Sequence, residues 1–294
     1  MRSCATWKVV IGTSSSISTA DVRARLMDYV EKNSGTIGLQ FNPTAQPPLP
    51  SYPYSEDSSE RRKIVHYLLL VASVDEGNVV GEADNARKLL VGLHSTLGDA
   101  LFSADEKALR EALSSLKMQF QTREARLIPN ILASVNSFLL ERARGDLVNY
   151  SKQFAIPAAL AEEIAMNILR MGRTLGSTRK KTWMYLRWMV RSRPDLRLFD
   201  HFHPKDLFVP VDRNVARVAA SLGKIPETHL KSLTWDDTVE VTNLAKDLYP
   251  NDPARVDYPF FLLGRKLRFS SALSERSLLS AVEQLSPSAK SNSV

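Results

Sequence analysis

The sequence predicts an all-helical protein, because apolar residues recur at helical spacing along most of the chain. Ile64, Leu68 and Ala72, for example, would share one face of a helix. Strand signals are few and short: the best are Trp7–Gly12 and Leu207–Val211, and each is equally compatible with an extended loop. We find no internal repeat with a period of about 20 to 50 residues. The predicted class is therefore all-α.

The N-terminal part combines a short helix, a connector and a longer apolar helix. The pattern predicts a helix over Ala20–Lys32, which the polar residues 33–35 close. Asn42–Ser59 is rich in proline and serine, so we expect an extended connector there. The next helix has an apolar face that begins at Ile64, and Gly77 is expected to end it.

Cap residues delimit the middle helices. Ser103 and Glu106 have the spacing of a capping box ahead of apolar residues at helical intervals. Pro157 suits the first turn of another helix, since no backbone N–H is needed there, and Gly172 is expected to end that helix.

Three further helices are predicted in the last third, before a polar tail whose composition predicts disorder. Gly223 is expected to end the first of them, Asp237 to open the second and Ser274 to open the third. We therefore divide the chain into an N-terminal segment with its connector, a helical lobe, a second helical lobe, and a C-terminal helix with its tail: residues 1–59, 60–150, 151–269 and 270–294.

Charge and composition indicate a globular protein with a polyanionic partner. The formal net charge is +7 and the hydrophobic content is 44%, which makes nucleic acid the first candidate partner and a membrane surface the second. Cys4 is the sole cysteine, so one chain can form neither an internal disulfide nor a four-cysteine metal site. Without an apolar run long enough to span a membrane or a secretory signal, we expect an intracellular protein.

The densest positive region of the sequence lies between Arg170 and Arg197, where Asp195 is the only acidic residue. Aromatic residues are interleaved with these cations, so the region offers both phosphate-binding charge and a surface on which bases could stack. The alternative is a solvated basic face above aromatic residues of the core. The aromatic residues in question are Trp183, Tyr185 and Trp188.

The same region has the order of a helix-hairpin-helix element. It combines a helix over Ala158–Met171, a turn over Arg173–Thr178 that contains Gly176, and a helix over Lys180–Val190. A glycine-containing turn before a helix presents backbone N–H groups to a phosphate, which is how such an element anchors DNA.

Two residues in this part of the chain could carry chemistry. Lys180 would lie in the first turn of its helix, where the helix dipole and the neighbouring cations favour the neutral amine that a Schiff-base nucleophile requires. The alternative is a surface lysine that contacts phosphate. Asp212 directly precedes a helix, so it is either a catalytic acid or an ordinary N-cap residue worth about 1 kcal/mol.

Three segments together resemble the helix-hairpin-helix DNA glycosylases that also cleave the strand. GSTRKKTWMYLRWMV over 176–190 is followed by VPVDRNVARVAASLG over 209–223 and by VDYPFFLLGR over 256–265. Their order and spacing are most similar to the archaeal 8-oxoguanine glycosylases, and a related uncharacterised bacterial family shares the apolar Lys-led helix. The resemblance covers roughly residues 64–267. The hairpin lacks the second glycine of the commoner pattern, and Thr178 stands in its place.

The resemblance implies a two-lobed helical glycosylase fold with the active site between the lobes. Counting from Gly176 selects Lys180 as the nucleophile, whereas the Lys-Thr pair of the archaeal motif selects Lys181 as the alternative. Asp212 would be the acidic partner. The residues expected to contact the DNA backbone are Gly176, Ser177, Thr178, Arg179 and Lys181.

The resemblance also implies a pocket for an extruded base. Asp257 matches a position that hydrogen-bonds the base and Phe261 one whose ring stacks on it, and we expect Met184 to join them. A loop or capping acid is the alternative for Asp257, and a plain core residue is the alternative for Phe261.

These inferences together predict a monomeric enzyme of base-excision repair that acts on double-stranded DNA with a damaged base. The base would be an oxidised purine, with 8-oxoguanine first. The nucleotide is flipped out of the duplex, Lys180 forms a Schiff base with the sugar, and β-elimination nicks the strand. We expect no metal and no cofactor. Three alternatives stay open: a nucleic-acid-binding protein without catalysis, a glycosylase without lyase activity, and a basic scaffold for acidic proteins.

Overall fold

The computed structural model describes residues 20–34, 58–75, 85–116, 123–192, 194–270 and 272–285. Within these ranges the chain forms helices joined by turns and loops and contains no β-strand, which confirms the all-α class. The possible strand at Trp7–Gly12, nearly all of the connector Asn42–Ser59, Gly77 and the tail lie outside the described residues. The other possible strand, Leu207–Val211, is a buried extended segment in which the Val209 amide donates to the Thr242 hydroxyl at 3.0 Å.

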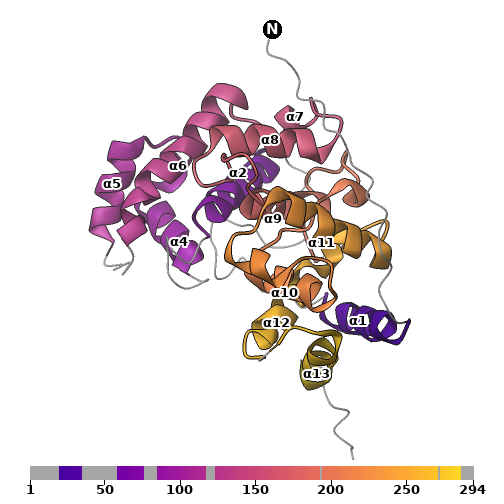
Figure 1. Cartoon of the computed structure of the whole chain (residues 1–294). Helices are drawn as coiled ribbons and strands as arrows, with labels where there is room; N and C mark the ends of the chain where they lie inside the picture. Colours follow the sequence, from indigo (N-terminus) through magenta and orange to yellow (C-terminus); the bar gives the residue numbers. More distant parts are fainter. Residues whose placement is uncertain are drawn as a thin grey trace, which may run out of the picture.

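Figure 1 shows these helices in sequence colours. In chain order they are α1 (Ala20–Asn33), α2 (Ser58–Val74), α4 (Asn85–Leu97), η2 (Gly98–Phe102), α5 (Glu106–Ser115), η3 (Arg123–Leu127), α6 (Ile128–Ser137), η4 (Phe138–Arg142), α7 (Leu147–Ser151), α8 (Pro157–Asn167), α9 (Lys180–Val190), η5 (Pro204–Asp206), α10 (Arg213–Ser221), η6 (Glu227–Lys231), α11 (Trp235–Leu248), η7 (Pro253–Val256), α12 (Asp257–Leu267) and α13 (Glu275–Leu285).

A first core is built around α2. Every residue from Ile64 to Val74 is buried, so α2 is covered on all sides and not along one face as the periodicity predicted. It packs against α4, α6, α7 and α9. Apolar side chains from these helices and from α5 and α8 form one continuous cluster, which also includes Leu207 and Ala254. We call this cluster the first core.

A second core joins the two ends of the chain. Apolar residues of α10, α11, α12 and α13 cluster with Leu26, Tyr29 and Val30 of α1, and we call this cluster the second core. Figure 1 shows the indigo α1 beside the yellow α12 and α13, and α1 packs against both. Arg25 of α1 reinforces this contact through an ion pair with Glu283 of α13 at 2.9 Å.

The two cores divide the chain differently from the four predicted segments. The first core runs past residue 150 and includes α8 and α9, and apart from α1 the second core is formed by residues from Val209 onward. α1 and α13 belong to the second core and are not separate terminal elements. The sequence could not indicate this because the division depends on contacts between segments that lie far apart along the chain.

Two predicted helix starts are wrong by a few residues. Asp105 caps α5, since its carboxylate accepts from the Ala108 amide at 2.8 Å, while Ser103 closes the preceding turn of η2. Likewise Thr234 is the N-cap of α11, and Asp237 lies inside the first turn as the acidic member of a capping box. The predicted helix end at Gly223 holds, since Gly223 follows α10 with φ 67°. The predicted helix start at Ser274 also holds, since its hydroxyl accepts from the Ser277 amide just before α13.

Candidate functional site

The connection between α8 and α9 is one turn longer than predicted. α8 ends at Asn167, because Ile168 has an extended backbone and the Leu169 amide donates to the Ser134 hydroxyl at 3.0 Å. The predicted end at Met171 is therefore wrong. The Ser134 hydroxyl of α6 accepts the hydrogen bond of the amide that would otherwise have continued the helix. The chain then reaches α9 through an irregular loop over residues 168–179.

Two glycines shape this loop. Gly172 has φ 102°, and a Cβ at this position would come within 2.7 Å of the Arg179 side chain, so the loop closes tightly on the start of α9. Gly176 has φ 80° and is exposed, with open space around it. Both positions require glycine for backbone reasons, as the predicted hairpin assumed for Gly176.

The loop offers free backbone donors. Among the described residues, the amides of Gly176 and Thr178 donate to no acceptor, whereas the Ser177 amide donates to the Thr174 carbonyl at 3.1 Å. The Gly176 carbonyl is held by the Trp235 amide at the start of α11, at 2.7 Å. Two of the five residues predicted to contact the DNA backbone, Gly176 and Thr178, therefore have an amide available for an anion, and the loop that carries them is anchored to α11.

The side chains predicted to help this anchor point into the protein. Arg179 is buried and pairs with Glu162 of α8. Lys181 is also buried, and its Nζ donates to the Ser73 carbonyl at the end of α2 at 2.8 Å. These internal partners replace the phosphate contacts that we predicted for Arg179 and Lys181. They also make Lys181 the less suitable of the two candidate nucleophiles.

The predicted stacking surface on α9 does not exist in this structure. Trp183, Tyr185 and Trp188 are buried in the first core. The Trp183 ring lies 5.0 Å from the ring of Phe208 and 6.2 Å from that of Trp235, both measured between centroids. The alternative interpretation of these aromatic residues as core is the correct one, because α9 lies in the middle of the molecule (Figure 1).

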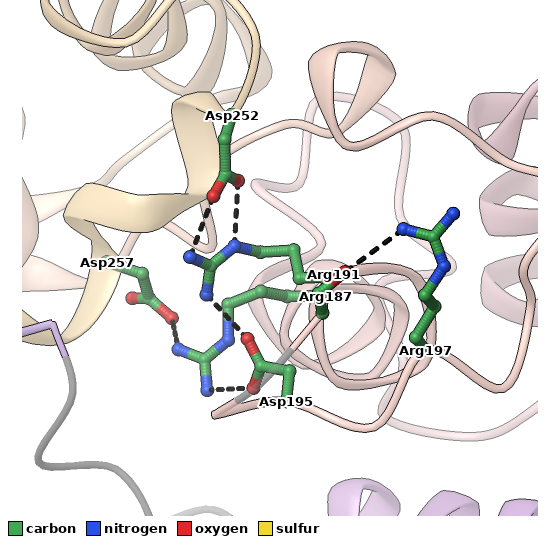
Figure 2. Close-up of polar contacts among 7 residues, drawn as sticks. Arg187, Arg191, Asp195, Arg197, Asp252 and Asp257 are labelled. Atoms are coloured by element: carbon green, nitrogen blue, oxygen red, sulfur yellow. Dashed lines mark hydrogen bonds and ion pairs between the residues drawn. The ribbon is translucent and has the colours of Figure 1, made fainter.

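Two arginines at the C-terminal end of α9, Arg187 and Arg191, belong to a buried ion-pair network, shown in Figure 2. Arg187 pairs with Asp257 and lies 3.5 Å from Asp195. Arg191 binds Asp195 at 2.5 Å and both carboxylate oxygens of Asp252, at 2.7 and 2.8 Å. Two arginines are thus opposed by three aspartates, two of which come from η7 and α12 rather than from the basic segment itself.

Asp257 of this network is influenced by the charges of two other predicted site residues, Lys180 and Asp212. Burial raises the pKa of the Asp257 carboxyl, the charges of Arg187 and Lys180 lower it, and the charge of Asp212 raises it further. Coulombic effects of this kind require proximity. Lys180 at the start of α9, Asp212 before α10 and Asp257 at the start of α12 therefore form one electrostatic cluster, which we call the Lys180 cluster.

Asp212 combines an N-cap role with a partly exposed carboxylate. Its Oδ1 accepts from the amides of Asn214 and Val215, at 2.8 and 3.0 Å. Its Oδ2 accepts no hydrogen bond from the described residues, and the side chain is half-buried. One oxygen therefore fixes the carboxylate at the start of α10, and the other is free for an external partner.

The other two residues predicted to contact the base, Met184 and Phe261, each lie about one helical turn after a residue of this cluster. Met184 is four residues after Lys180 on α9 and is buried against the first core. Phe261 is four residues after Asp257 on α12, is half-buried, and has the Arg265 guanidinium 5.9 Å from its ring centroid. Asp257 itself is bound by Arg187, which the prediction of a base contact did not include.

Sequence reasoning missed Arg187 and Arg191 as network residues. They are four residues apart, at the end of a helix whose last turns are otherwise apolar or aromatic, and this spacing indicates a buried cationic face that needs acidic partners. Asp252 and Asp257 could not be assigned as those partners, because more than 60 residues separate them from α9.

Other features of the described residues lie away from the Lys180 cluster. A hollow of about 210 Å³ lies between α5 and the start of α6 and is lined by Arg110, Leu113, Ser114, Ala125, Arg126, Ile128 and Pro129. No group of three or more His, Cys, Asp or Glu side chains within the described ranges is arranged to hold a metal ion. Among the helices there, none is both long and apolar enough to cross a membrane.

Comparison with known proteins gives one match. The family model described as "Protein of unknown function (DUF2400)" matches residues 69–266, which include α9, α10 and most of α12. A search of curated proteins finds no match. The matched range contains every residue of the Lys180 cluster.

Proposed function

Because the chain belongs to the DUF2400 family, a family of unknown function, we propose a function from its own residues. The protein is a DNA glycosylase with AP lyase activity that removes an oxidised purine, with 8-oxoguanine as the first candidate. Lys180 is the nucleophile and Asp212 is its acidic partner. The observation that carries this proposal is the Lys180 cluster, in which the amine of Lys180 and the carboxylate of Asp212 both act on the carboxylate of Asp257.

The arrangement of the two cores supports a two-lobed fold with the active site between its lobes. Lys180 belongs to α9, whose apolar residues are part of the first core. Asp212 and Asp257 begin α10 and α12, whose apolar residues form the second core. Groups from two separately packed units meet at the cluster, which is a common location for a ligand site.

The charge balance of the cluster suits a positive transition state. The buried network contains two arginines and three aspartates, and Asp212 adds a further carboxylate. This acidic surplus favours positive charge at the sugar as the base departs. An ammonium ion has no lone pair, so Lys180 must give up a proton before it attacks.

The proposed steps conserve atoms and charge. The bond between C1′ and the base breaks, the base takes the electron pair and receives the proton that Lys180 gives up, and the neutral Nζ bonds to C1′. A second proton moves from Nζ to O4′ as the C1′–O4′ bond breaks, which leaves an iminium ion. Loss of a C2′ proton then expels the 3′ phosphate by β-elimination. Asp212 Oδ2 stabilises the cationic sugar throughout.

The hairpin loop supports binding of the DNA strand. The free amides of Gly176 and Thr178 precede α9, whose N-cap residue Arg179 makes no side-chain cap. Unsatisfied N–H groups and the helix dipole favour a phosphate at this position. The phosphate would be held by the backbone, since Arg179 and Lys181 have internal partners.

Borohydride trapping tests the nucleophile. With duplexes that contain 8-oxoguanine or an abasic site, we expect wild-type protein to form a covalent adduct, because borohydride reduces the iminium ion to a stable amine. Lys180→Gln should abolish the adduct. Lys107→Gln, which changes an exposed lysine of α5, is the matched control and should retain it. An adduct that persists in Lys180→Gln would move the role to Lys181.

Asp212→Asn tests the acidic partner in the same assay. The amide oxygen can still cap α10, so the variant should fold and bind DNA, while base release slows by about 100- to 1000-fold. Loss of folding and activity together would instead assign Asp212 a capping role only.

One observation favours an alternative. Asp257 has a structural partner in Arg187, and Asp212 has a structural role as N-cap, so neither carboxylate requires catalysis to explain it. The alternative is a nucleic-acid-binding protein that uses the same hairpin amides without chemistry. It predicts salt-sensitive DNA binding with no base release and no trapped adduct.

A further inference from the structure

A group of arginines lies together where α10 begins and α12 ends. We define the α10–α12 basic patch as Arg213, Arg217, Arg265 and Arg268. Arg213, Arg265 and Arg268 are exposed and Arg217 is half-buried. Within the described part of the chain none of the four forms an ion pair, in contrast to Arg179, Arg187 and Arg191.

One glycine brings the two helices together here. A Cβ on Gly264 would lie 1.8 Å from the Asn214 carbonyl oxygen, so the backbones of α10 and α12 are in direct contact. Residues 257, 261, 264, 265 and 268 follow helical spacing along one side of α12. This side runs from Asp257 in the Lys180 cluster to Arg268 in the basic patch.

Arg217 is close enough to Arg213 and Arg268 for their charges to act on it. The pKa of Arg217 is lowered by its partial burial and then by the charges of Arg213 and Arg268, while Asp212 opposes this effect. The Arg217 side chain has one polar partner among the described residues, the Asn214 amide oxygen at 2.6 Å. Like charges thus repel one another at the surface, and Asp212 compensates them only in part.

Helix electrostatics explain only part of the patch. Arg265 and Arg268 are at the C-terminal end of α12, where the helix dipole favours cations. Arg213 is in the first turn of α10, where the dipole disfavours a cation. Its charge therefore costs stability locally, and an anionic partner would compensate that cost.

An exposed aromatic ring borders the patch. Phe269 directly follows Arg268, and 83% of its surface is accessible. Cations beside an exposed aromatic ring are a combination typical of surfaces that bind nucleic acid, since they provide both phosphate contacts and a stacking face. The same combination was predicted for α9, where the rings are buried.

We propose that the α10–α12 basic patch binds the phosphate backbone of the duplex that flanks the nucleotide held at Lys180. This inference rests on the proposed function for its choice of duplex DNA. At about 1.5 Å per residue, Arg268 is about 16 Å from Asp257 along α12. That length corresponds to about five base steps of a DNA strand. The patch contacts the duplex on one side of the lesion, and Phe269 packs against a sugar or a base there.

The test combines a pair of substitutions with a change in duplex length. Arg213→Gln/Arg268→Gln removes two charges of the patch, and Lys107→Gln/Lys152→Gln removes two exposed charges from α5 and from the loop after α7 as the matched control. Binding of labelled duplex is measured across salt concentrations. One duplex extends about ten base pairs on each side of the lesion and another extends about three.

For the longer duplex, we expect Arg213→Gln/Arg268→Gln to weaken binding at least tenfold and to reduce the slope of log K against log salt by about two. The control should match wild type. For the shorter duplex, the difference between patch variant and wild type should be smaller, because the phosphates that Arg268 reaches are absent while Arg213, directly after Asp212, still lies near the lesion. Thermal unfolding of each variant establishes that the fold is kept.

The outcomes separate this inference from the proposed function. Equal salt slopes for patch variant and control on the longer duplex would overturn the inference, even if lyase activity is present. Patch-dependent DNA binding without any trapped adduct would support the patch and overturn the lyase. Patch-dependent binding to anionic vesicles, with no binding to DNA, would overturn the nucleic-acid partner in favour of a membrane surface.

Discussion

His66 illustrates how a single buried residue sets a property of the protein. It lies in α2, and its Nε2 accepts from the Leu147 amide at the start of α7 at 3.4 Å. Burial lowers the pKa of His66 from 6.5 to about 4, with the charge of Asp146 acting against that shift. The folded protein therefore holds a neutral imidazole, which is the form that can accept this hydrogen bond.

The shift predicts a loss of stability in acid. Between pH 6.5 and about 4 the unfolded chain binds a proton at His66 that the folded chain does not, so stability falls as the pH falls through this range. The loss amounts to about 3 kcal/mol at the acidic end. His66→Gln keeps an acceptor and removes the titration, so its unfolding midpoint in urea should fall less than that of wild type between pH 7 and pH 4.5. Parallel pH profiles for the two proteins would contradict this assignment.

At the scale of elements, the contact between α10 and α12 depends on Gly264. The pair also positions Asp212, because α10 begins directly after that residue. A helix interior normally disfavours glycine by about 1 kcal/mol relative to alanine. At Gly264 the close approach of α10 requires glycine in spite of this cost, since the Asn214 carbonyl occupies the space that a side chain would need.

Gly264→Ala should therefore destabilise the protein although alanine is the better helix former. We expect a loss of at least about 3 kcal/mol in the free energy of unfolding, because backbone atoms must move. Gly98→Ala is the matched control: Gly98 has φ 57° and open space around it, so only backbone strain of about 1 to 2 kcal/mol applies. Urea unfolding measures the loss of stability in both variants. Equal losses would show that the contact between Gly264 and Asn214 adds nothing to the cost of the substitution.

At the scale of the whole molecule, the buried network is a polar link between the two cores. Arg187 and Arg191 extend from α9 in the first core, while Asp252 and Asp257 precede and begin the last helices of the second. Forming a buried ion pair costs desolvation energy, but removing only one of its two partners costs far more, because the remaining charge is then buried without compensation. The network thus fixes one relative placement of the two cores.

Substitution of Arg187 tests this link. Arg187→Met should cost about 3 to 5 kcal/mol in the free energy of unfolding, because Asp257 and Asp195 lose a buried partner. The double variant Arg187→Met/Asp257→Asn should recover part of that loss. A double-mutant cycle should therefore give a coupling energy of about 1 to 3 kcal/mol between the two residues. Arg142→Met, which breaks an exposed ion pair with Glu163, is the control and should change stability little. Strict additivity of the Arg187 and Asp257 substitutions would refute the link.

Much of the local structure followed from the sequence, and the exceptions have physical causes. The span of α9 and the glycine after α10 were predicted from periodicity and caps. The end of α8 was not, because the hydroxyl of Ser134 takes a backbone amide from across the fold. The roles of Arg179 and Lys181 were likewise decided by Glu162 and the Ser73 carbonyl, neither of which is a sequence neighbour.

The sequence by itself determined the helical class, the short-range caps, the net positive charge, and the order of Lys180, Asp212 and Asp257 along the chain. These depend on periodicity, composition and near neighbours. Only the tertiary structure decided that the rings of α9 are buried, that its arginines are neutralised from distant segments, and that unpaired cations gather at α10 and α12 instead. The reason is that burial and pairing are set by contacts across the fold, which spacing along one chain does not encode.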